Sequence, residues 1–335
     1  ARELAALGFR VFFVEPFTSP GWSVVAENVV DRLTVLKLKV PFKASSVPAL
    51  QRIVCRLAEK LLKKQLDCSI SQAILWLAEP SLAALTELSW ARILYDRCDL
   101  HGSFPGQKKS VWRRYEAEIE ENACLISVSH PFLAESIISR RDKIVLAPNA
   151  CSEAFLAQGQ MAAPRRRLSA EITGDSAQSP IRLVSSGAHY EWVDCEWLKM
   201  LACLDAVELH IAGTGRGNAF YELLQLPNVK NHGHLNHSDL IQLLVKCDVG
   251  LIPFRDLPLI KGVDPIKAYE YTACGLEVWA PDLVPLHSNL MISRFIANPV
   301  VAAAALKEYR SASKPFAGPI PVWQERLAPI LARLL

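Results

Sequence analysis

The chain has 335 residues, of which 51% are hydrophobic and 21% are charged, and its formal net charge at pH 7 is +3. This length favours one or two domains, each large enough to bury its own core. The small net charge argues against a nucleic-acid-binding protein, and no apolar run is long enough to span a bilayer. Nine cysteines without a C-x-x-C pair or zinc-ligand spacing favour reduced thiols in a cytoplasmic protein.

The first half of the chain alternates apolar stretches with helical patterns. Residues 1–7 predict a helix, and the apolar run at 10–15 predicts a buried strand. Apolar and basic residues alternate over 33–40, which is typical of an exposed or edge strand. Residues 47–66 predict a long helix whose apolar face includes Ile53. Further strands are expected at 73–77, 91–95, 125–129 and 143–146, and further helices between the first two of these and at 111–124 and 131–139.

A change of composition separates the two halves. Residues 158–180 are rich in Ala, Gln, Arg, Pro, Gly and Ser, which is typical of an interdomain linker. The second half again alternates strands and helices, which predicts parallel sheets with right-handed crossovers in both halves. Ser238 is expected to cap one of these helices. The predicted organisation is a first domain at 1–157 that lacks a leading strand, the linker at 158–180, a second domain at 181–310 and a closing helix at 311–335.

The stretch from Gly262 to Ala280 carries the densest functional pattern. Pro265 suits the first turn of a helix, Gly275 ends that helix, and an apolar strand follows. A helix N-terminus with a nearby lysine, here Lys267, suits a phosphate. A glutamate one turn further on can accept hydrogen bonds from sugar hydroxyls. The alternative is an ordinary amphipathic helix that leads into a strand.

This stretch resembles the nucleotide-sugar signature P-x-K-x-x-E-Y-x-A-x-G-x-P-V-V of glycosyltransferases with two Rossmann-like domains, the GT-B fold. The matching positions are Pro265, Lys267, Glu270, Tyr271, Ala273, Gly275 and Val278, whereas Glu277 and Trp279 replace the usual Pro and Val. Segments 181–194, 210–215, 228–233 and 249–254 are similar to motifs of bacterial members that make cell-surface polysaccharides. Residues 95–99 resemble a Y-x-x-x-D segment of inverting glucuronosyltransferases.

The resemblance implies an α/β fold with two Rossmann-like domains whose parallel sheets face a cleft, and a C-terminal helix that returns to the first domain. It also implies transfer of a hexosyl or glycuronosyl group from a nucleotide sugar to a glycan or lipid-linked acceptor. A UDP-sugar is expected rather than a GDP-sugar, with no cofactor. Lys267 is assigned to the diphosphate and Glu270 to the ribose. The other candidates for the nucleotide-sugar site are Asp264, Pro265, Tyr271, Gly187, Gly213 and His234.

Several of these residues also have simpler explanations. Asp264 could cap its helix instead of touching the sugar, and the glycines could serve only their turns. His234 could be a plain turn histidine.

Asp99 is the candidate catalytic base, because an inverting transfer needs a carboxylate to take the acceptor's proton. A loop aspartate in an Asx turn is the alternative role, and Asp96 and His101 are the next candidates. The first Glu of the Glu-x7-Glu pair of many retaining members would fall at Gly262. The Arg and Lys that often follow the first strand of the second domain are also missing, with His189 as the nearest substitute. We therefore expect inversion, and no metal requirement because no Asp-x-Asp motif occurs.

Basic residues cluster in two runs of the first half, at 52–64 and 108–114. Such runs suit peripheral contact with anionic lipid at the inner face of a membrane, although a solvated helix face is the commoner explanation. A nonhydrolysing nucleotide-sugar epimerase and a noncatalytic nucleotide-sugar-binding paralogue are the alternative functions. The absence of a G-x-G-x-x-G after a strand argues against a nicotinamide dehydrogenase.

Overall fold

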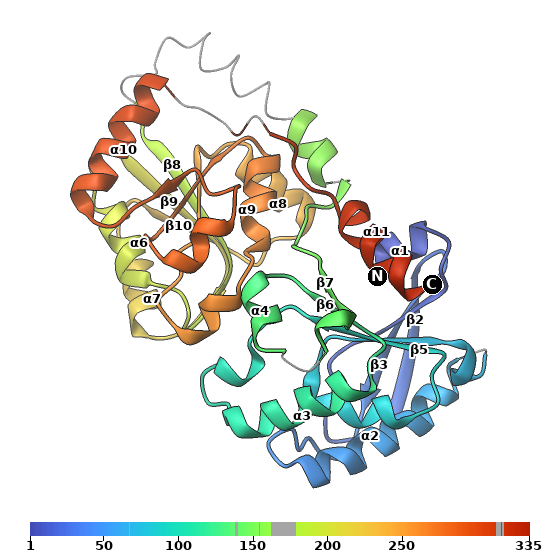
Figure 1. The fold of residues 1–335 in the computed structure, drawn as a ribbon. Helices are drawn as coiled ribbons and strands as arrows, with labels where there is room; N and C mark the ends of the chain where they lie inside the picture. Colours follow the sequence, from blue (N-terminus) through green and yellow to red (C-terminus); the bar gives the residue numbers. More distant parts are fainter. Residues whose placement is uncertain (67, 138–139, 154, 162–178, 313–315, 317) are drawn as a thin grey trace. The chain divides into compact units, whose positions relative to one another are not determined.

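The computed structural model describes residues 1–335 except 67, 138–139, 154, 162–178, 313–315 and 317. It divides into two units, Ala1–Pro148 with Leu327–Leu335 and Asn149–Arg326 (Figure 1). The predicted linker at 158–180 lies largely outside the described residues. None of the described helices is both long and apolar enough to cross a membrane.

The first unit contains two sheets. Its three-stranded sheet has the order β1-β3-β2, and its four-stranded sheet, in the order β4-β5-β6-β7, is parallel throughout. The strands are β1 (Val11–Val14), β2 (Ser23–Val30), β3 (Leu33–Lys39), β4 (Ile74–Leu77), β5 (Arg92–Arg97), β6 (Leu125–Val128) and β7 (Ile144–Leu146). The helices are α1 (Arg2–Ala6), α2 (Pro48–Lys63), α3 (Lys109–Asn122) and α4 (Pro131–Glu135), with 3₁₀ turns η1 (Ile70–Gln72), η2 (Pro80–Glu87), η3 (His101–Ser103) and η4 (Arg141–Lys143).

Of the two alternatives predicted for 33–40, an exposed or an edge strand, the edge strand is wrong, because β3 is the middle strand of its sheet. It pairs in parallel with β1 and antiparallel with β2, a strand that the sequence pattern did not reveal. Leu36 and Leu38 are buried, whereas Lys37 is exposed and forms an ion pair of 2.8 Å with Glu27 of β2. The alternation therefore reflects one solvated face of the sheet and not an edge. The sequence predicted parallel sheets in both halves, and the antiparallel β2–β3 pair shows that this prediction is wrong for the three-stranded sheet.

The apolar face predicted for α2 (Ile53, Leu57, Leu61 and Leu62) is confirmed at Leu61 and Leu62, which are buried, and is wrong at Ile53. Ile53 is 48% exposed, whereas Val54 and Ala58 are buried. These two residues and Leu61 pack with Leu36 of β3 in one hydrophobic cluster. The sheet beneath the helix therefore selects the face that includes Val54, which lies one position from the predicted one.

The second unit is built on a six-stranded parallel sheet with the order β10-β9-β8-β11-β12-β13. The strands are β8 (Ile181–His189), β9 (Val207–Gly215), β10 (Val229–Gly233), β11 (Val249–Leu251), β12 (Glu277–Ala280) and β13 (Arg294–Phe295). The helices are α6 (Cys195–Ala202), α7 (Asn218–Leu223), α8 (His237–Leu244), α9 (Ile266–Ala273) and α10 (Pro299–Ala312), with 3₁₀ turns η5 (Pro258–Gly262) and η6 (Val284–Ser288). The last helix, α11 (Trp323–Leu334), begins in this unit.

Two details of the second unit bear on the sequence predictions. The strand after Gly275 is confirmed, because all of β12 is buried. The predicted cap Ser238 is wrong, because the side chain of Asn236 accepts the hydrogen bond from the Asp239 N–H at the start of α8. Asparagine is as good an N-cap as serine, so the pattern alone did not separate the two.

Helix α11 contributes residues to both units. Its later residues Ile330 and Leu334 are buried in a cluster of the first unit with Leu94 of β5, Leu125 of β6 and Ala147. The C-terminal residues of the chain thereby complete the core on one face of the four-stranded sheet.

The two departures from the signature strand form one buried polar group. The Glu277 carboxylate accepts hydrogen bonds from Trp279 Nε1 at 3.1 Å and from Arg294 Nε at 2.8 Å. Arg294 also pairs with Glu308 of α10 at 2.6 Å. The charge of Glu277 is therefore balanced inside the unit, where an unpaired carboxylate would be strongly destabilising.

Helix α9 is held against the sheet by Tyr271. Its buried hydroxyl accepts a hydrogen bond from the Ser186 N–H of β8 at 2.8 Å and lies 3.0 Å from the Ser186 hydroxyl. A Cβ atom at Gly250 of β11 would lie only 2.2 Å from the Tyr271 ring. The missing side chain at Gly250 thus makes room for the ring that fixes α9 to the end of β8.

Replacing Tyr271 with phenylalanine tests this arrangement. Tyr271→Phe leaves the partly buried Ser186 N–H without its acceptor, so we expect the free energy of unfolding in urea to fall by about 1–3 kcal/mol. Tyr221→Phe is the control, because Tyr221 is 57% exposed and a surface change of this kind stays within about 0.5 kcal/mol. Equal stability of the two variants would contradict the role given to the Tyr271 hydroxyl.

Candidate functional site

Two glycines face each other where β8 and β9 end. Gly187 and Gly213 are paired in register, and their φ angles of 129° and 125° are ones that side chains rarely adopt. A Cβ atom at Gly213 would lie 1.9 Å from the Gly187 carbonyl oxygen. An added Cβ at Gly187 would meet only Lys267 Cε, at 3.9 Å. The strand ends are therefore bare backbone, at the edge of a parallel sheet where α/β proteins bind ligands.

Lys267 and Glu270 lie at the start of α9, beside this glycine pair. Lys267 Nζ forms an ion pair of 2.6 Å with Glu270 Oε2, and the two side chains are 29% and 10% exposed. The helix begins after Pro265, and no side chain caps it. A lysine held by a carboxylate, first-turn N–H groups and open backbone together provide positive charge and hydrogen-bond donors suited to a phosphate.

Asp264 is engaged inside the unit and does not cap α9. Its carboxylate accepts hydrogen bonds from the Asn149 N–H at 2.6 Å, from Asn289 Nδ2 at 2.8 Å and from the Tyr269 hydroxyl at 3.1 Å. Burial raises the pKa of Asp264, and these donors act against the rise. Asp264 thus ties the loop at Asn149 to the start of α9. Nothing in the sequence pattern pointed to Asn149 or Asn289 as partners of Asp264.

Two histidines of the second unit have different surroundings. His189 is buried, its Nε2 lies 2.8 Å from the Ser185 hydroxyl, and its ring stacks on Phe220 at 5.5 Å. Burial lowers the pKa of His189 to about 4, so the ring is neutral at pH 7. It therefore cannot replace the positive charge that the signature expects after this strand. His234, in contrast, is exposed just after β10.

In the first unit, Asp96 of β5 and Asp99, which follows that strand, differ in what surrounds them. The Asp96 carboxylate is buried and accepts hydrogen bonds from Trp76 Nε1 at 2.9 Å and the Ser127 hydroxyl at 2.6 Å. Asp99 is half-buried in the loop that follows, and burial raises its pKa, with an opposing effect of His101. Asp96 is thus committed to the sheet, and Asp99 has the raised pKa that suits a base.

The loop that carries Asp99 starts from a buried ion pair that the sequence pattern did not reveal. Arg97 Nη2 lies 3.1 Å from Glu116 of α3, and Arg97 Nη1 donates to the Ser136 hydroxyl at 2.7 Å. Both side chains of the pair are almost fully buried. At the other end of the loop, the His101 ring stacks on Trp112 at 5.6 Å. The residues on both sides of Asp99 are therefore fixed to α3.

No three His, Cys, Asp or Glu side chains gather closely enough to hold a metal ion in the part of the chain that the structure describes.

Comparisons with known proteins agree on the fold. No protein-family model matches the sequence. The chain is 23% identical over 229 residues to TuaH of Bacillus subtilis (strain 168), which is named as a glycosyltransferase of teichuronic acid biosynthesis. This match covers 62% of the chain, which spans only 55% of the length of TuaH.

Solved structures of sugar-transferring enzymes are similar over most of the chain. Sucrose-phosphate synthase from Thermosynechococcus elongatus matches with a TM-score of 0.62 and 14% identity, covering 92% of this chain and 82% of the synthase. Anabaena HepE in complex with UDP and glucose matches with a TM-score of 0.59 and 13% identity, covering 90% of this chain and 82% of HepE. The UDP-forming trehalose-phosphate synthase of Burkholderia xenovorans with glucose 6-phosphate matches with a TM-score of 0.58 and 14% identity. This match covers 97% of this chain and 90% of the synthase.

These similarities and the parallel sheets agree with the resemblance found in the signature stretch. The chain is similar in sequence to a bacterial glycosyltransferase, and it has the α/β fold of GT-B glycosyltransferase structures.

Proposed function

We propose that this chain is a glycosyltransferase that moves a hexosyl or glycuronosyl group from a UDP-sugar to a glycan or lipid-linked acceptor of a surface polysaccharide. The observation that carries the proposal is the Lys267–Glu270 ion pair at the start of α9, next to the bare backbone at Gly187. HepE and trehalose-phosphate synthase, which share the fold, support a UDP-linked donor, since UDP is named for both.

In this proposal, Lys267 contacts the diphosphate of the donor. Negative charge grows on the diphosphate as its bond to the sugar breaks, so a fixed cation there stabilises the transition state more than the ground state. Glu270 holds the ammonium in place and accepts hydrogen bonds from the ribose hydroxyls. The glycines let the nucleotide approach the ends of β8 and β9 closely.

Asp99 is the proposed base for an inverting reaction without a metal ion. The carboxylate takes the proton of the acceptor hydroxyl while that oxygen attacks the sugar carbon and the nucleoside diphosphate leaves. A raised pKa makes Asp99 a stronger base than an ordinary aspartate. Asp96 is not assigned this role because its carboxylate already accepts two internal hydrogen bonds.

Replacing Lys267 tests the donor site. UDP at about one hundred times its dissociation constant stabilises a folded protein by roughly 2.7 kcal/mol, which appears as a higher melting temperature. Loss of one charge-assisted hydrogen bond in Lys267→Ala weakens UDP binding about 10- to 100-fold, so roughly half or more of this shift disappears at the same UDP concentration. Lys246→Ala is the control, because Lys246 is an exposed lysine that precedes the N-terminal end of β11, whereas the candidate site lies at the C-terminal ends of the strands. An undiminished UDP shift in Lys267→Ala would place the donor elsewhere.

Replacing Asp99 tests the chemistry separately from binding. We expect Asp99→Asn to lower sugar transfer by roughly 10²- to 10⁴-fold while the UDP-induced melting shift stays unchanged. Asp31→Asn, in the same unit, is the control because the Asp31 side chain is 95% exposed. Full transfer by Asp99→Asn would exclude Asp99 as the base, and UDP binding without transfer by the unmodified chain would indicate a noncatalytic paralogue.

The pH dependence gives a second test of Asp99. Only the ionised carboxylate can act as a base, so transfer falls as the pH falls through the pKa of Asp99. Because burial raises this pKa, the loss begins at a higher pH than it would for an ordinary aspartate. A rate profile that stays flat down to the pKa of an ordinary aspartate would contradict the assignment.

A further inference from the structure

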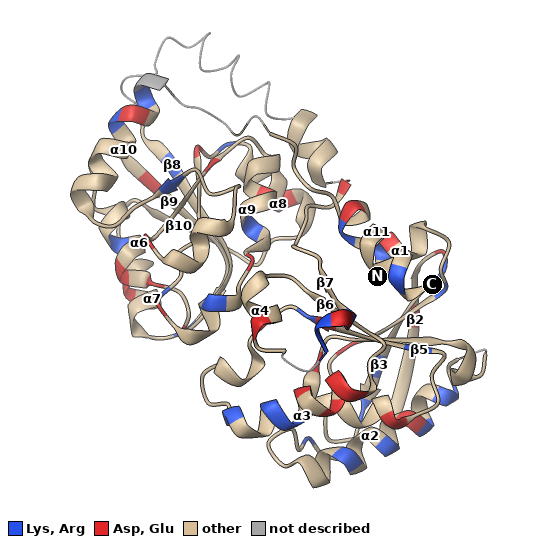
Figure 2. Cartoon of the chain, viewed as in Figure 1, with Lys and Arg blue, Asp and Glu red and all other residues tan. Residues whose placement is uncertain are grey.

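A pocket of about 270 Å³ lies in the first unit, and none of the residues assigned above lines it. Its lining comes from the start of α2, from η2 and from α3, and it includes Arg52, Arg56 and Arg114. Both helices pack against η2. Figure 2 shows Lys and Arg along the same two helices. Three arginines from two helices therefore line a single pocket.

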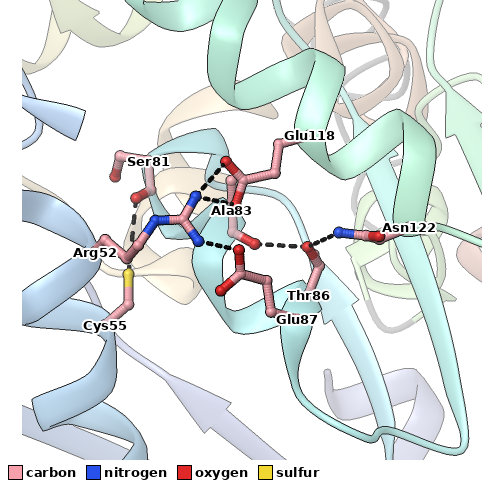
Figure 3. Close-up of polar contacts among 8 residues, drawn as sticks. All are labelled: Arg52, Cys55, Ser81, Ala83, Thr86, Glu87, Glu118 and Asn122. Atoms are coloured by element: carbon pink, nitrogen blue, oxygen red, sulfur yellow. Dashed lines mark hydrogen bonds and ion pairs between the residues drawn. The ribbon is translucent and has the colours of Figure 1, made fainter. Parts of the chain in front are cut away.

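Arg52 is fixed as part of the wall. Its guanidinium group donates to both carboxylate oxygens of Glu118, at 3.1 and 3.0 Å, and to Glu87, so that it lies between the two acids (Figure 3). The same wall is reinforced by Asn122, which donates to the Thr86 hydroxyl at 2.9 Å. The positive charge of Arg52 is thus compensated by neighbouring acids, and its side chain joins α2 to α3 and η2.

Arg56 and Arg114 are in a different situation. Both are exposed, and neither forms a hydrogen bond or ion pair with any residue that the structure describes. Glu118 also lines the pocket; burial raises its pKa, and the charges of Arg52 and Arg114 act against that rise. Arg56 follows Arg52 by one turn of α2, whereas Arg114 comes from α3. The first turn of α2, which also lines the pocket at Pro48 and Ala49, has no side-chain cap and no acidic residue. Two guanidinium forks and a positive helix end around one hollow match a phosphate group.

Apolar side chains surround the same end of α2. Val47, Leu50 and Ile53 are 47%, 44% and 48% exposed, and Ile53 itself lines the pocket. Phe42, just before the helix, is 38% exposed. Charged groups that flank exposed apolar residues on one helix are typical of a surface that enters the lipid headgroup region. Trp112, which the sequence placed in the second basic run, is buried and takes no part.

We propose that this pocket binds the phosphate of an anionic lipid head group, with Arg56 and Arg114 as its ligands and Leu50 and Ile53 in contact with the hydrocarbon boundary. The exposed apolar residues favour a lipid over a soluble phosphate, because a soluble ligand would leave them in water. This inference does not depend on the proposed transfer reaction, since membrane binding is measured without turnover.

Sedimentation with lipid vesicles tests the proposal. We expect the chain to bind vesicles that contain phosphatidic acid in phosphatidylcholine much more tightly than vesicles of phosphatidylcholine alone. The double variant Arg56→Gln/Arg114→Gln should lose at least roughly 30-fold in partition coefficient, as expected for two basic residues near an anionic surface. Arg52 is left intact, because its removal would leave Glu118 and Glu87 without their partner.

A charge-matched control separates the pocket from general surface charge. Lys60→Gln/Lys109→Gln removes two positive charges from the same two helices, at exposed positions that do not line the pocket. Equal losses in the two double variants would overturn the pocket as a binding site. Unchanged melting temperatures in both variants establish that folding does not cause the difference.

Two further arms identify the ligand. Leu50→Ser/Ile53→Ser should weaken vesicle binding without removing charge, whereas unchanged binding would overturn the lipid contact. Glycerol 3-phosphate is the soluble probe and is expected to bind weakly or not at all. If it binds with the same dependence on Arg56 and Arg114 while vesicles do not, the ligand is a soluble phosphate and the assignment to lipid is wrong.

Discussion

The hydrogen bond from the Ser186 N–H to the Tyr271 hydroxyl is the contact on which the candidate donor site depends. Tyr271 follows Lys267 by one helical turn, so both project from the same face of α9. Ser186 precedes Gly187 directly, and the Lys267 stem comes to lie beside that glycine. A buried core contact therefore sets the position of a half-exposed cation. The absent side chain at Gly250 is part of the same arrangement, because the Tyr271 ring occupies its space.

Environment assigns different roles to residues of the same type. Asp96 and Asp264 are both buried carboxylates whose oxygens are used by neighbouring donors, so both hold structure together. Asp99 lies near Asp96 in the chain but has a raised pKa and residues fixed on either side. The same contrast applies to arginines, since Arg52 is neutralised by two acids and Arg56, one turn later, is not. Residue type alone does not distinguish these cases.

The sequence predicted the second unit better than the first. The strands at 181, 249 and 277 are short apolar runs between glycines, prolines and helical patterns, and such signals are local. The first unit depended more on tertiary contacts, which explains why β2 was missed and why the apolar face of α2 was placed around Ile53. For the candidate site, Lys267, Glu270 and the glycines were proposed from their match to the signature and its neighbouring motifs, all of which are local. The partners Asn289, Ser186 and Glu116 could not, because each lies far along the chain from the residue that it holds.

The group formed by Glu277, Trp279 and Arg294 constrains how the sequence can diverge. Changing Glu277 alone to the proline usual at that position would deprive the partly buried Arg294 guanidinium of one of its two carboxylates, and changing Arg294 alone would leave the buried acid without its counter-charge. Each single substitution is therefore expected to destabilise the fold, so substitutions at the three positions are expected to occur together. Related sequences are therefore expected either to keep all three residues or to replace all three.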